Sequence, residues 1–196
     1  MAPFRYMMIS TVACEAGYLD EAAGHLTGVM GELASALPDV SAYFGSFHAG
    51  RNAGSLALVH LYRDLADVDP AFGVYGASPH FAAAAGSGKI ALRERNLTRL
   101  MEAEQRGSDA IAPVQLLLRH TAPGLDAGSR ARLADATMGA GAAQFRCGTV
   151  WTGTVAGNGI VTLGCPTPDV ADAVEAACRE ALPGAMPERD LLCVTG

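Results

Sequence analysis

The stretch DPAFGVYGASPHF, residues 69–81, carries two helix-start signals in succession. Asp69 is followed by Pro70, and Ser78 is followed by Pro79. Each pair offers an N-cap side chain ahead of a proline at the first helical position, where the missing N–H of proline costs nothing. We therefore expect a helix here that bends or restarts at Pro79.

The segments around this stretch complete a unit of strand, helix, strand, strand, helix, strand over residues 4–100. Apolar residues recur at helical spacing from Asp20 to Leu37, which predicts the first helix. A glycine-bearing connection between two apolar runs predicts a hairpin in the middle of the unit. The expected strands are Arg5–Val12, Ser41–His48, Ser55–Tyr62 and Lys89–Leu100.

The same order of elements recurs over residues 113–195, although hardly any residues match between the two halves. Its clearest element is a helix capped by Thr167, with Pro168 behind it. The other expected elements are the strands Val114–His120, Gln144–Trp151, Gly159–Cys165 and Leu191–Thr195, and a weaker helix at Ser129–Ala140.

These patterns divide the chain into a first repeat at 1–101, a polar linker at 102–112 and a second repeat at 113–196. A β-α-β-β-α-β order gives a four-stranded antiparallel sheet with both helices on one face, and the other face needs a cover. The predicted fold class is therefore α+β, with two ferredoxin-like repeats whose antiparallel sheets pack into an α+β barrel. We expect a self-contained pseudo-dimer or a homodimer, with the space between the sheets as a first candidate place for function.

The opening stretch also resembles the second-helix motif of the dimeric α+β barrel superfamily, in particular its antibiotic biosynthesis monooxygenase branch. That motif commonly carries a histidine, two intervening residues and Ser-Pro-His-Phe. Residues 78–81 match it, and Tyr75 stands in the place of the earlier histidine. The second half shares only the order of elements. The resemblance implies a ligand cavity between sheet and helices, often holding an aromatic or polycyclic substrate that O2 oxidises without metal or flavin.

The resemblance leaves several activities open. Some relatives bind haem, and others isomerise lactones or cyclise polyketides. The replacement of the earlier histidine by Tyr75 argues against haem, although tyrosine can ligate haem iron. We favour an antibiotic biosynthesis monooxygenase-like enzyme that oxidises a phenolic or polycyclic aromatic small molecule with no cofactor. The alternatives are a haem or small-ligand binding protein of the same fold, or a barrel without chemistry.

Cofactor-free oxygenation sets chemical requirements. A phenol-like substrate must lose a proton so that its anion can pass an electron to O2, which calls for a base and hydrogen-bond donors in apolar surroundings that exclude water. The candidate bases are His80 and His60. The candidate substrate-binding residues are Tyr62, Tyr75, Phe81, Arg95, Asn96 and Trp151.

Each candidate also has a structural interpretation. His80 could reach into a cavity or pack the bend at Pro79. His60 shares its strand face with Leu58 and Tyr62, where a histidine is often a hydrogen-bonded core residue. Trp151 could stack a planar ligand or fill the core. Because four of the five histidines lie in the first half, we expect that half to hold the function.

Composition narrows the class of protein. The net charge of −6 is spread without a basic stripe, which excludes a typical nucleic-acid binder. No His or Cys spacing resembles a zinc site, and no metal site is predicted. The expected partner is a small aromatic molecule.

The cysteines and the N-terminal stretch bear on location. The five cysteines are scattered without a Cys-x-x-Cys pair, which fits free thiols in a reducing cytoplasm. The apolar residues after Arg5 are broken by Ser10 and Thr11, so they indicate a strand in preference to a signal peptide. No run approaches the roughly 20 apolar residues of a membrane span. We therefore expect a cytoplasmic protein away from membranes.

Overall fold

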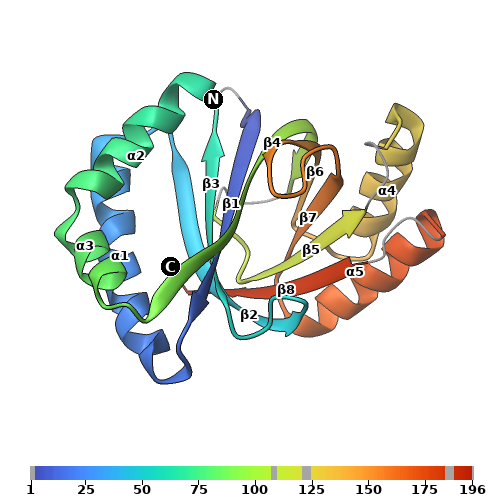
Figure 1. Ribbon diagram of the computed structural model, residues 1–196. Helices are drawn as coiled ribbons and strands as arrows, with labels where there is room; N and C mark the ends of the chain where they lie inside the picture. Colours follow the sequence, from blue (N-terminus) through green and yellow to red (C-terminus); the bar gives the residue numbers. More distant parts are fainter. Residues whose placement is uncertain (1–2, 107–109, 121–124, 184–187, 196) are drawn as a thin grey trace.

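Eight strands close into one barrel in the computed structural model of the chain, which describes residues 3–106, 110–120, 125–183 and 188–195. Five helices cover the outside of this barrel within those residues, and Figure 1 shows them in two groups on opposite sides. The group formed by the first half of the chain contains the restarted helix, and the group formed by the second half contains the two remaining helices.

The first half runs from β1 to β4 and includes two short 3₁₀ helices, η1 and η2. Its elements are β1 (Tyr6–Cys14), η1 (Ala16–Tyr18), α1 (Leu19–Ala36), β2 (Ser41–Gly50), β3 (Leu56–Tyr62), η2 (Leu65–Asp67), α2 (Val68–Ala77), α3 (Pro79–Gly86) and β4 (Ile90–Gln105). The second half consists of β5 (Val114–His120), α4 (Ala127–Gly139), β6 (Gln144–Gly153), β7 (Gly159–Cys165), α5 (Pro168–Ala181) and β8 (Glu188–Val194).

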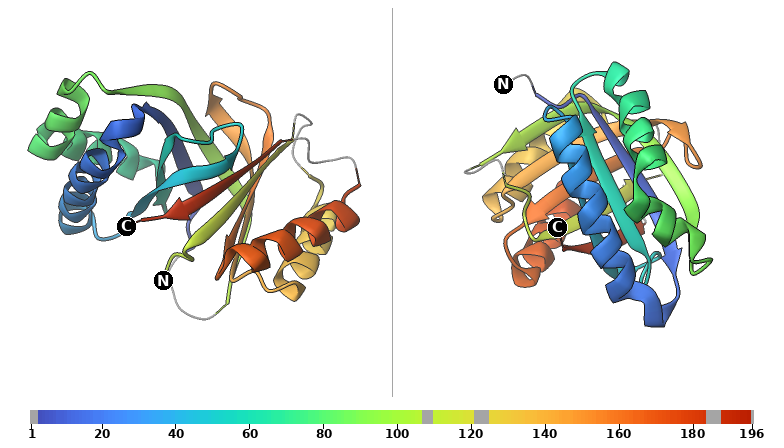
Figure 2. Two further views of the ribbon diagram at one scale, coloured as in Figure 1. Left: turned by 90° about the horizontal axis from the view of Figure 1, so that it is seen from below. Right: turned by 90° about the vertical axis from the view of Figure 1, so that its left-hand side faces the viewer.

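The strand order around the barrel is β1-β3-β2-β8-β5-β7-β6-β4, and every neighbouring pair is antiparallel. Each half therefore contributes one four-stranded sheet, and the two sheets join where β2 meets β8 and where β4 meets β6. Helices α1, α2 and α3 cover the first sheet, and α4 and α5 cover the second (Figure 2). The predicted fold class is confirmed, and the barrel closes within one chain.

Side chains alternate along each strand between the barrel interior and the helices. The middle of the interior is filled by apolar side chains from both sheets, among them Met7, Val59, Leu117 and Ile160. The expectation that the space between the sheets holds the function is therefore wrong for the middle of the barrel, which is a packed core. Two further apolar layers lie outside the barrel, one under each group of helices.

The predicted restart of the second helix is confirmed. Ser78 has an extended backbone, and its Oγ accepts a hydrogen bond from the backbone N–H of Phe81, 3.1 Å away. Pro79 occupies the first position of α3, where no N–H is needed. The break separates α2 from α3, so the two helices take independent orientations over the first sheet.

The predicted N-cap at Asp69 is wrong. Helix α2 begins one residue earlier, at Val68, directly after η2. Asp64 provides the side-chain cap instead, accepting a hydrogen bond from the N–H of Ala66 at the start of η2. Asp69 and Pro70 lie in the first turn of α2, where a missing N–H is equally harmless.

Strand β4 is longer than predicted, because it continues to Gln105 and takes in residues assigned to the linker. Its polar end is held by pairing with β6, in which Ala103 lies opposite Arg146 and Gln105 opposite Gln144. Residues 107–109 of the predicted linker lie outside the described residues. The other predicted strands and helices agree with the structure apart from small shifts at their ends.

All five cysteines are free thiols, and Cys147, Cys165 and Cys178 are buried as small apolar side chains. Among the described residues, no helix is both long and apolar enough to span a membrane.

Candidate functional site

A cavity of about 200 Å³ lies between the first sheet and helices α1, α2 and α3. We call it the helix-side cavity. One residue of its wall, Leu92, is 54% exposed. The apolar part of its wall consists of Met8, Val12, Ala22, Leu26, Leu56, Leu58, Phe72, Phe81, Ala84, Ala85, Ile90 and Leu92. Its polar part consists of Ser10, His60, Tyr75 and Arg95.

The break between α2 and α3 shapes this cavity. Phe72 and Tyr75 enter the wall from α2, and Phe81 enters it from α3. The rings of Tyr75 and Phe81 meet edge to face, with centroids 5.1 Å apart. Helix α3 adds only alanines beyond Phe81, and small side chains leave space between helix and sheet. The local sequence thus opens a cavity where a continuous, bulkier helix would fill it.

His60 and Tyr75 form the polar centre of the cavity. His60 projects from β3 and is 1% exposed, and its Nε2 lies 2.6 Å from the hydroxyl oxygen of Tyr75. Burial, with a smaller contribution from the charge of Arg95, lowers the pKa of His60 to about 4. Burial, together with the nearby Tyr62 hydroxyl, raises the pKa of Tyr75 far above its usual value. Both side chains are therefore neutral near pH 7.

One nitrogen of this imidazole remains available. The Nδ1 of His60 is buried and has no hydrogen-bond partner among the described residues. When Nε2 is hydrogen-bonded to Tyr75, a neutral imidazole keeps Nδ1 as its second donor or acceptor. The pair can therefore hold a polar group of a ligand or accept its proton.

Arg95 supplies positive charge at the same wall. Its Nε donates a hydrogen bond to Ser10 Oγ over 2.9 Å, and its guanidinium lies 4.8 Å from the centroid of the Phe72 ring. Among the described residues of the wall, Arg95 is the only one with a formal charge at neutral pH. A cation fixed beside an apolar cavity stabilises a negative charge that forms there.

The structure brings together four of the predicted site residues on the cavity wall: His60, Tyr75, Phe81 and Arg95. Tyr62 lies next to them on β3, with its ring stacked on His60 at 5.9 Å between centroids. Its hydroxyl is buried and has no partner among the described residues, and Tyr62 is outside the cavity wall. Tyr62 thus contacts His60 and does not reach the cavity.

His80 is not part of the cavity. It is exposed on α3, and its ring lies over Gly28 of α1, 6.3 Å from the ring of His25. A Cβ at Gly28 would stand 2.5 Å from a carbon of the His80 ring, so the glycine makes room for the histidine. The contact packs α3 against α1, so His80 has a packing role, but at α1 and not at the bend beside Pro79.

Asn96 and Trp151 also lie away from the cavity. Asn96 faces the barrel interior, because it follows Arg95 on the same strand, and its Oδ1 accepts a hydrogen bond from Val155 N. Trp151 is 58% exposed and stacks on Tyr6 with centroids 6.4 Å apart. It therefore fills neither the core nor the helix-side cavity.

The sequence pattern does not indicate that Ser10 and Phe72 belong to the wall of the helix-side cavity. Ser10 appeared only as a break in an apolar run, yet it lies opposite Arg95 across the β1–β4 pair and fixes its side chain. Phe72 carries the ring beneath the same guanidinium. Alternation along β1 could have placed Ser10 on one face with Met8, but the register between β1 and β4 was needed to find its partner.

Among the described residues of the second half, an apolar core occupies the corresponding position. Between α4, α5 and the second sheet lies a continuous apolar core that includes Leu116, Leu133, Met138, Phe145 and Val174. Within the part of the chain that the structure describes, the helix-side cavity of the first half combines an open space with polar groups between helices and sheet, and the second half shows an apolar core there.

No protein-family model and no curated protein matches the sequence. Solved structures match over nearly the whole chain. A proposed monooxygenase from Lactobacillus acidophilus has a TM-score of 0.62 at 12% identity, covering 98% of this chain and 93% of that one. A proposed monooxygenase from Fusobacterium nucleatum has a TM-score of 0.67 at 10% identity, covering 100% and 94%. This chain has the dimeric α+β barrel fold.

Solved structures of differently named proteins with this fold match over a similar share of both chains. A chlorite dismutase variant from Candidatus Nitrospira defluvii has a TM-score of 0.63 at 9% identity, covering 100% of this chain and 93% of that one. An anthrone oxidase-like protein has a TM-score of 0.51 at 12% identity, covering 98% and 92%. At such identities the structural similarity establishes only the fold, the dimeric α+β barrel. The activity has to be inferred from the residues of the site.

The helix-side cavity of this dimeric α+β barrel does not fit haem. Drug-sized ligands occupy pockets of roughly 300–1,000 Å³, whereas this cavity measures about 200 Å³. The Nε2 of His60, the natural axial ligand, is already hydrogen-bonded to Tyr75. Among the described residues, no group of three or more His, Cys, Asp or Glu side chains could hold a metal ion.

Proposed function

We propose that the protein is a cofactor-independent oxygenase that deprotonates a small phenol or hydroquinone in the helix-side cavity and lets the anion react with O2. The observation that carries the proposal is the neutral His60–Tyr75 pair beside Arg95 on an otherwise apolar wall. The fold shared with proposed monooxygenases and an anthrone oxidase-like protein supports it.

The proton and the electrons have defined routes. His60 takes the phenolic proton, and Arg95 stabilises the oxyanion. The anion passes one electron to O2, and the resulting radical and superoxide combine at a ring carbon. That carbon carries a hydrogen, so the hydroperoxide loses water and leaves a carbonyl there, which turns a phenol or hydroquinone into a quinone with one more oxygen atom. The substrate gives up four electrons and O2 takes up four, with one oxygen atom in the product and one in water, so no external reductant is needed.

The low basicity of His60 makes Arg95 essential to this scheme. A phenol has a pKa of about 10, and the pKa of His60 is about 4. Proton transfer between them in isolation would cost about 8 kcal/mol, at 1.36 kcal/mol for each pKa unit. Formation of the phenolate beside Arg95 and the new imidazolium offsets part of this cost, because opposite charges attract strongly in apolar surroundings.

The size of the cavity narrows the substrate. A volume of about 200 Å³ is below the range typical of drug-sized ligands. We therefore favour substrates with one or two rings over larger polycyclic compounds. Exposed Leu92 marks the side from which they would enter.

The test is O2 consumption by the purified protein with one-, two- and three-ring hydroquinones and anthrones. We expect one O2 consumed per quinone formed, no requirement for added metal or reductant, and a rate that falls as the number of rings rises. The Arg95→Met variant should lose the activity, whereas Arg93→Met, which alters an exposed neighbour on β4, should keep it. Equal rates for these two variants would refute the proposed role of the cation.

A second candidate is a small-ligand binding protein that uses the same cavity. The lowered pKa of His60 favours it, because a weakly basic imidazole can hydrogen-bond a phenol without taking its proton. This candidate predicts saturable binding of the same phenols, detected by calorimetry, with no O2 consumption. Turnover of any bound phenol with O2 would decide for the oxygenase.

A further inference from the structure

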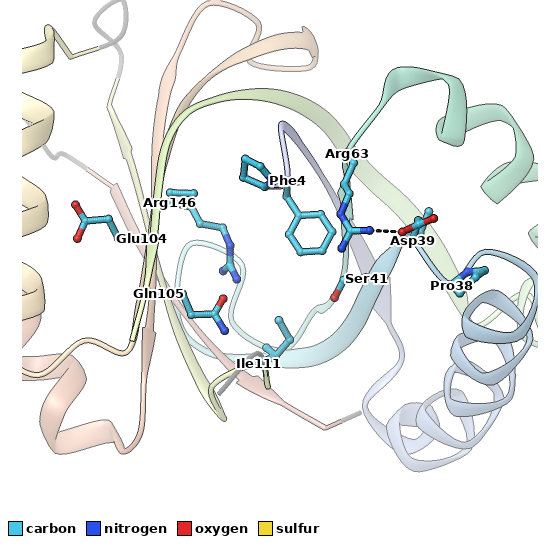
Figure 3. Close-up of a pocket in the computed structure, with 12 residues that line it drawn as sticks. Phe4, Pro38, Asp39, Ser41, Arg63, Glu104, Gln105, Ile111 and Arg146 are labelled. Atoms are coloured by element: carbon cyan, nitrogen blue, oxygen red, sulfur yellow. Dashed lines mark hydrogen bonds and ion pairs between the residues drawn. The ribbon is translucent and has the colours of Figure 1, made fainter. Parts of the chain in front are cut away.

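A second cavity, of about 440 Å³, opens at one end of the barrel (Figure 3). It lies where β1, β2 and β6 begin and where β3 and β4 end. We call it the barrel-mouth cavity. It is lined by Pro3, Phe4, Pro38, Asp39, Val40, Ser41, Arg63, Ala103, Glu104, Gln105, Ile111 and Arg146. It differs from the helix-side cavity in every lining residue.

Arg146 is the unusual residue of this cavity. It is only 4% exposed, it projects from β6 toward the cavity in Figure 3, and its Nη1 is buried without a hydrogen-bond partner among the described residues. No described carboxylate forms an ion pair with it. A buried guanidinium without a counter-charge is strongly unfavourable, so the described residues alone leave this site incomplete.

The two acidic residues of the wall do not compensate this charge. Asp39 forms an ion pair with Arg63 at the rim. Glu104 points out of the barrel in Figure 3, as expected for a residue between the inward-facing Ala103 and Gln105. Among the described residues, Arg146 therefore remains without a counter-charge.

Another interior arginine shows how this barrel supplies counter-charges to a buried guanidinium. Arg119 is 6% exposed, and its Nη2 lies 2.8 Å from Glu94 Oε1 and 3.7 Å from Asp190 Oδ2. The chain thus neutralises one of its buried arginines with two carboxylates of its own. Arg146 faces a cavity at the place where such carboxylates would stand.

We propose that the barrel-mouth cavity binds a small organic carboxylate. Its carboxylate pairs with Arg146, because the guanidinium fork matches the two oxygens of a carboxylate. Its apolar body lies against Phe4, Val40 and Ile111, which belong to the apolar part of the lining. The volume of about 440 Å³ falls within the range for small-molecule ligands. This site is separate from the proposed oxygenase site, since the two cavities lie on opposite sides of the first sheet.

The test uses octanoate as the probe, with octanol as its neutral analogue and inorganic phosphate as a bare anion. Calorimetry on the wild type, Arg146→Met and Arg99→Met compares the buried arginine with an exposed one on β4. We expect octanoate to bind the wild type and Arg99→Met equally, and to bind Arg146→Met at least about tenfold more weakly, the loss expected for a charge-assisted hydrogen bond. Octanol should bind at least about tenfold more weakly than octanoate.

Several results would overturn the proposal: no octanoate binding at millimolar concentration, equal binding by Arg146→Met, or phosphate binding as tightly as octanoate. If Arg146→Met does not fold, an NMR experiment on the wild type tests the proposal instead. In its amide NMR spectrum, octanoate should shift the resonances of Ser41, Ala103 and Ile111 and leave those of His60 and Phe81 unchanged. The opposite pattern would place the carboxylate in the helix-side cavity and refute the assignment.

Discussion

The two halves of the molecule share an order of elements but differ in how tightly their helices cover the sheet. In the second half, α5 runs without a break, and the described residues beneath α4 and α5 form an apolar core. In the first half, the chain breaks at Ser78 between α2 and α3, and a cavity remains over the sheet. The helix restart at Ser78 and the run of alanines after it thus account for the difference between the packed second half and the candidate site of the first half.

Equivalent strands show the same contrast. Strand β3 presents Leu58, His60 and Tyr62 to its helices, whereas β7 presents Val161 and Leu163. The first half replaces part of an apolar surface with a histidine and a tyrosine that are costly to bury. Polar groups kept in a hydrophobic layer beside open space are the strongest sign of function in this chain.

The largest expected effect comes from removing a leucine under each group of helices. Leu133→Ala, in the packed second half, should lower the free energy of unfolding by about 4 kcal/mol, and Leu26→Ala, on the cavity wall, by about 2 kcal/mol. The difference arises because Leu26 already borders open space and has fewer contacts to lose. Urea unfolding of both variants measures it, and equal losses would contradict the contrast between the halves.

The next effect is the pH dependence of stability. Because the pKa of His60 falls to about 4 on folding from an ordinary value of 6.5, the unfolded chain binds its proton first as the pH drops. The stability that His60 contributes is complete above pH 6.5 and is lost as the pH falls toward 4, by about 3 kcal/mol in total. Unfolding measured across this window should be less pH-dependent in His60→Gln than in the wild type.

The matched control for the pH dependence is His80→Gln, because His80 is exposed. This variant should keep the wild-type slope between pH 6.5 and pH 4. If His80→Gln and His60→Gln flatten the slope equally, the burial of His60 is not its cause.

A third comparison enlarges one buried alanine side chain in each half. Ala84 on the wall of the helix-side cavity and Ala134 in the second-half core are both buried on helices. Ala134→Leu should destabilise the protein by about 1–3 kcal/mol through overpacking. Ala84→Leu should be nearly neutral, because its side chain enters existing space. Thermal unfolding of the pair distinguishes a true cavity from a packed layer, and similar losses would argue against the cavity.

The smallest effect concerns the tyrosine hydroxyls beside His60. Tyr75→Phe removes the partner of His60 Nε2 and should cost about 1 kcal/mol of stability. Tyr62→Phe removes a buried hydroxyl that has no partner among the described residues, so it should leave stability unchanged or raise it. Chemical unfolding of both variants provides the measurement, and a larger loss for Tyr62→Phe would show that its hydroxyl is satisfied after all.

Much of the fold follows from local patterns in the sequence. Helical spacing over α1, the caps at Ser78 and Thr167 and the hairpin between β2 and β3 all act within a few residues, so they can be recognised without knowledge of the partners. The polar end of β4 is different. It forms a strand because β6 pairs with it, and such long-range pairing leaves no local pattern.

The sequence places a residue of the candidate site correctly only where the alternation of side chains along a strand fixes the face on which it lies. His60 was placed correctly on one face of β3 with Tyr62, and the same rule applied to β4 would have separated Arg95 from Asn96. The position of His80 depends on how α3 turns after the break, and that of Ser10 on the register between β1 and β4. Both depend on tertiary packing, which the local sequence does not specify.

The proposed function places the active centre in the first half, with His60 and not His80 as its base. O2 consumption by the wild type, His60→Gln and His80→Gln, with a one- or two-ring hydroquinone that the wild type oxidises, tests it most directly. The account predicts that His60→Gln loses about 100-fold or more in kcat, while His80→Gln retains the wild-type rate. Full activity in His60→Gln, or its loss in a folded His80→Gln, would contradict the account.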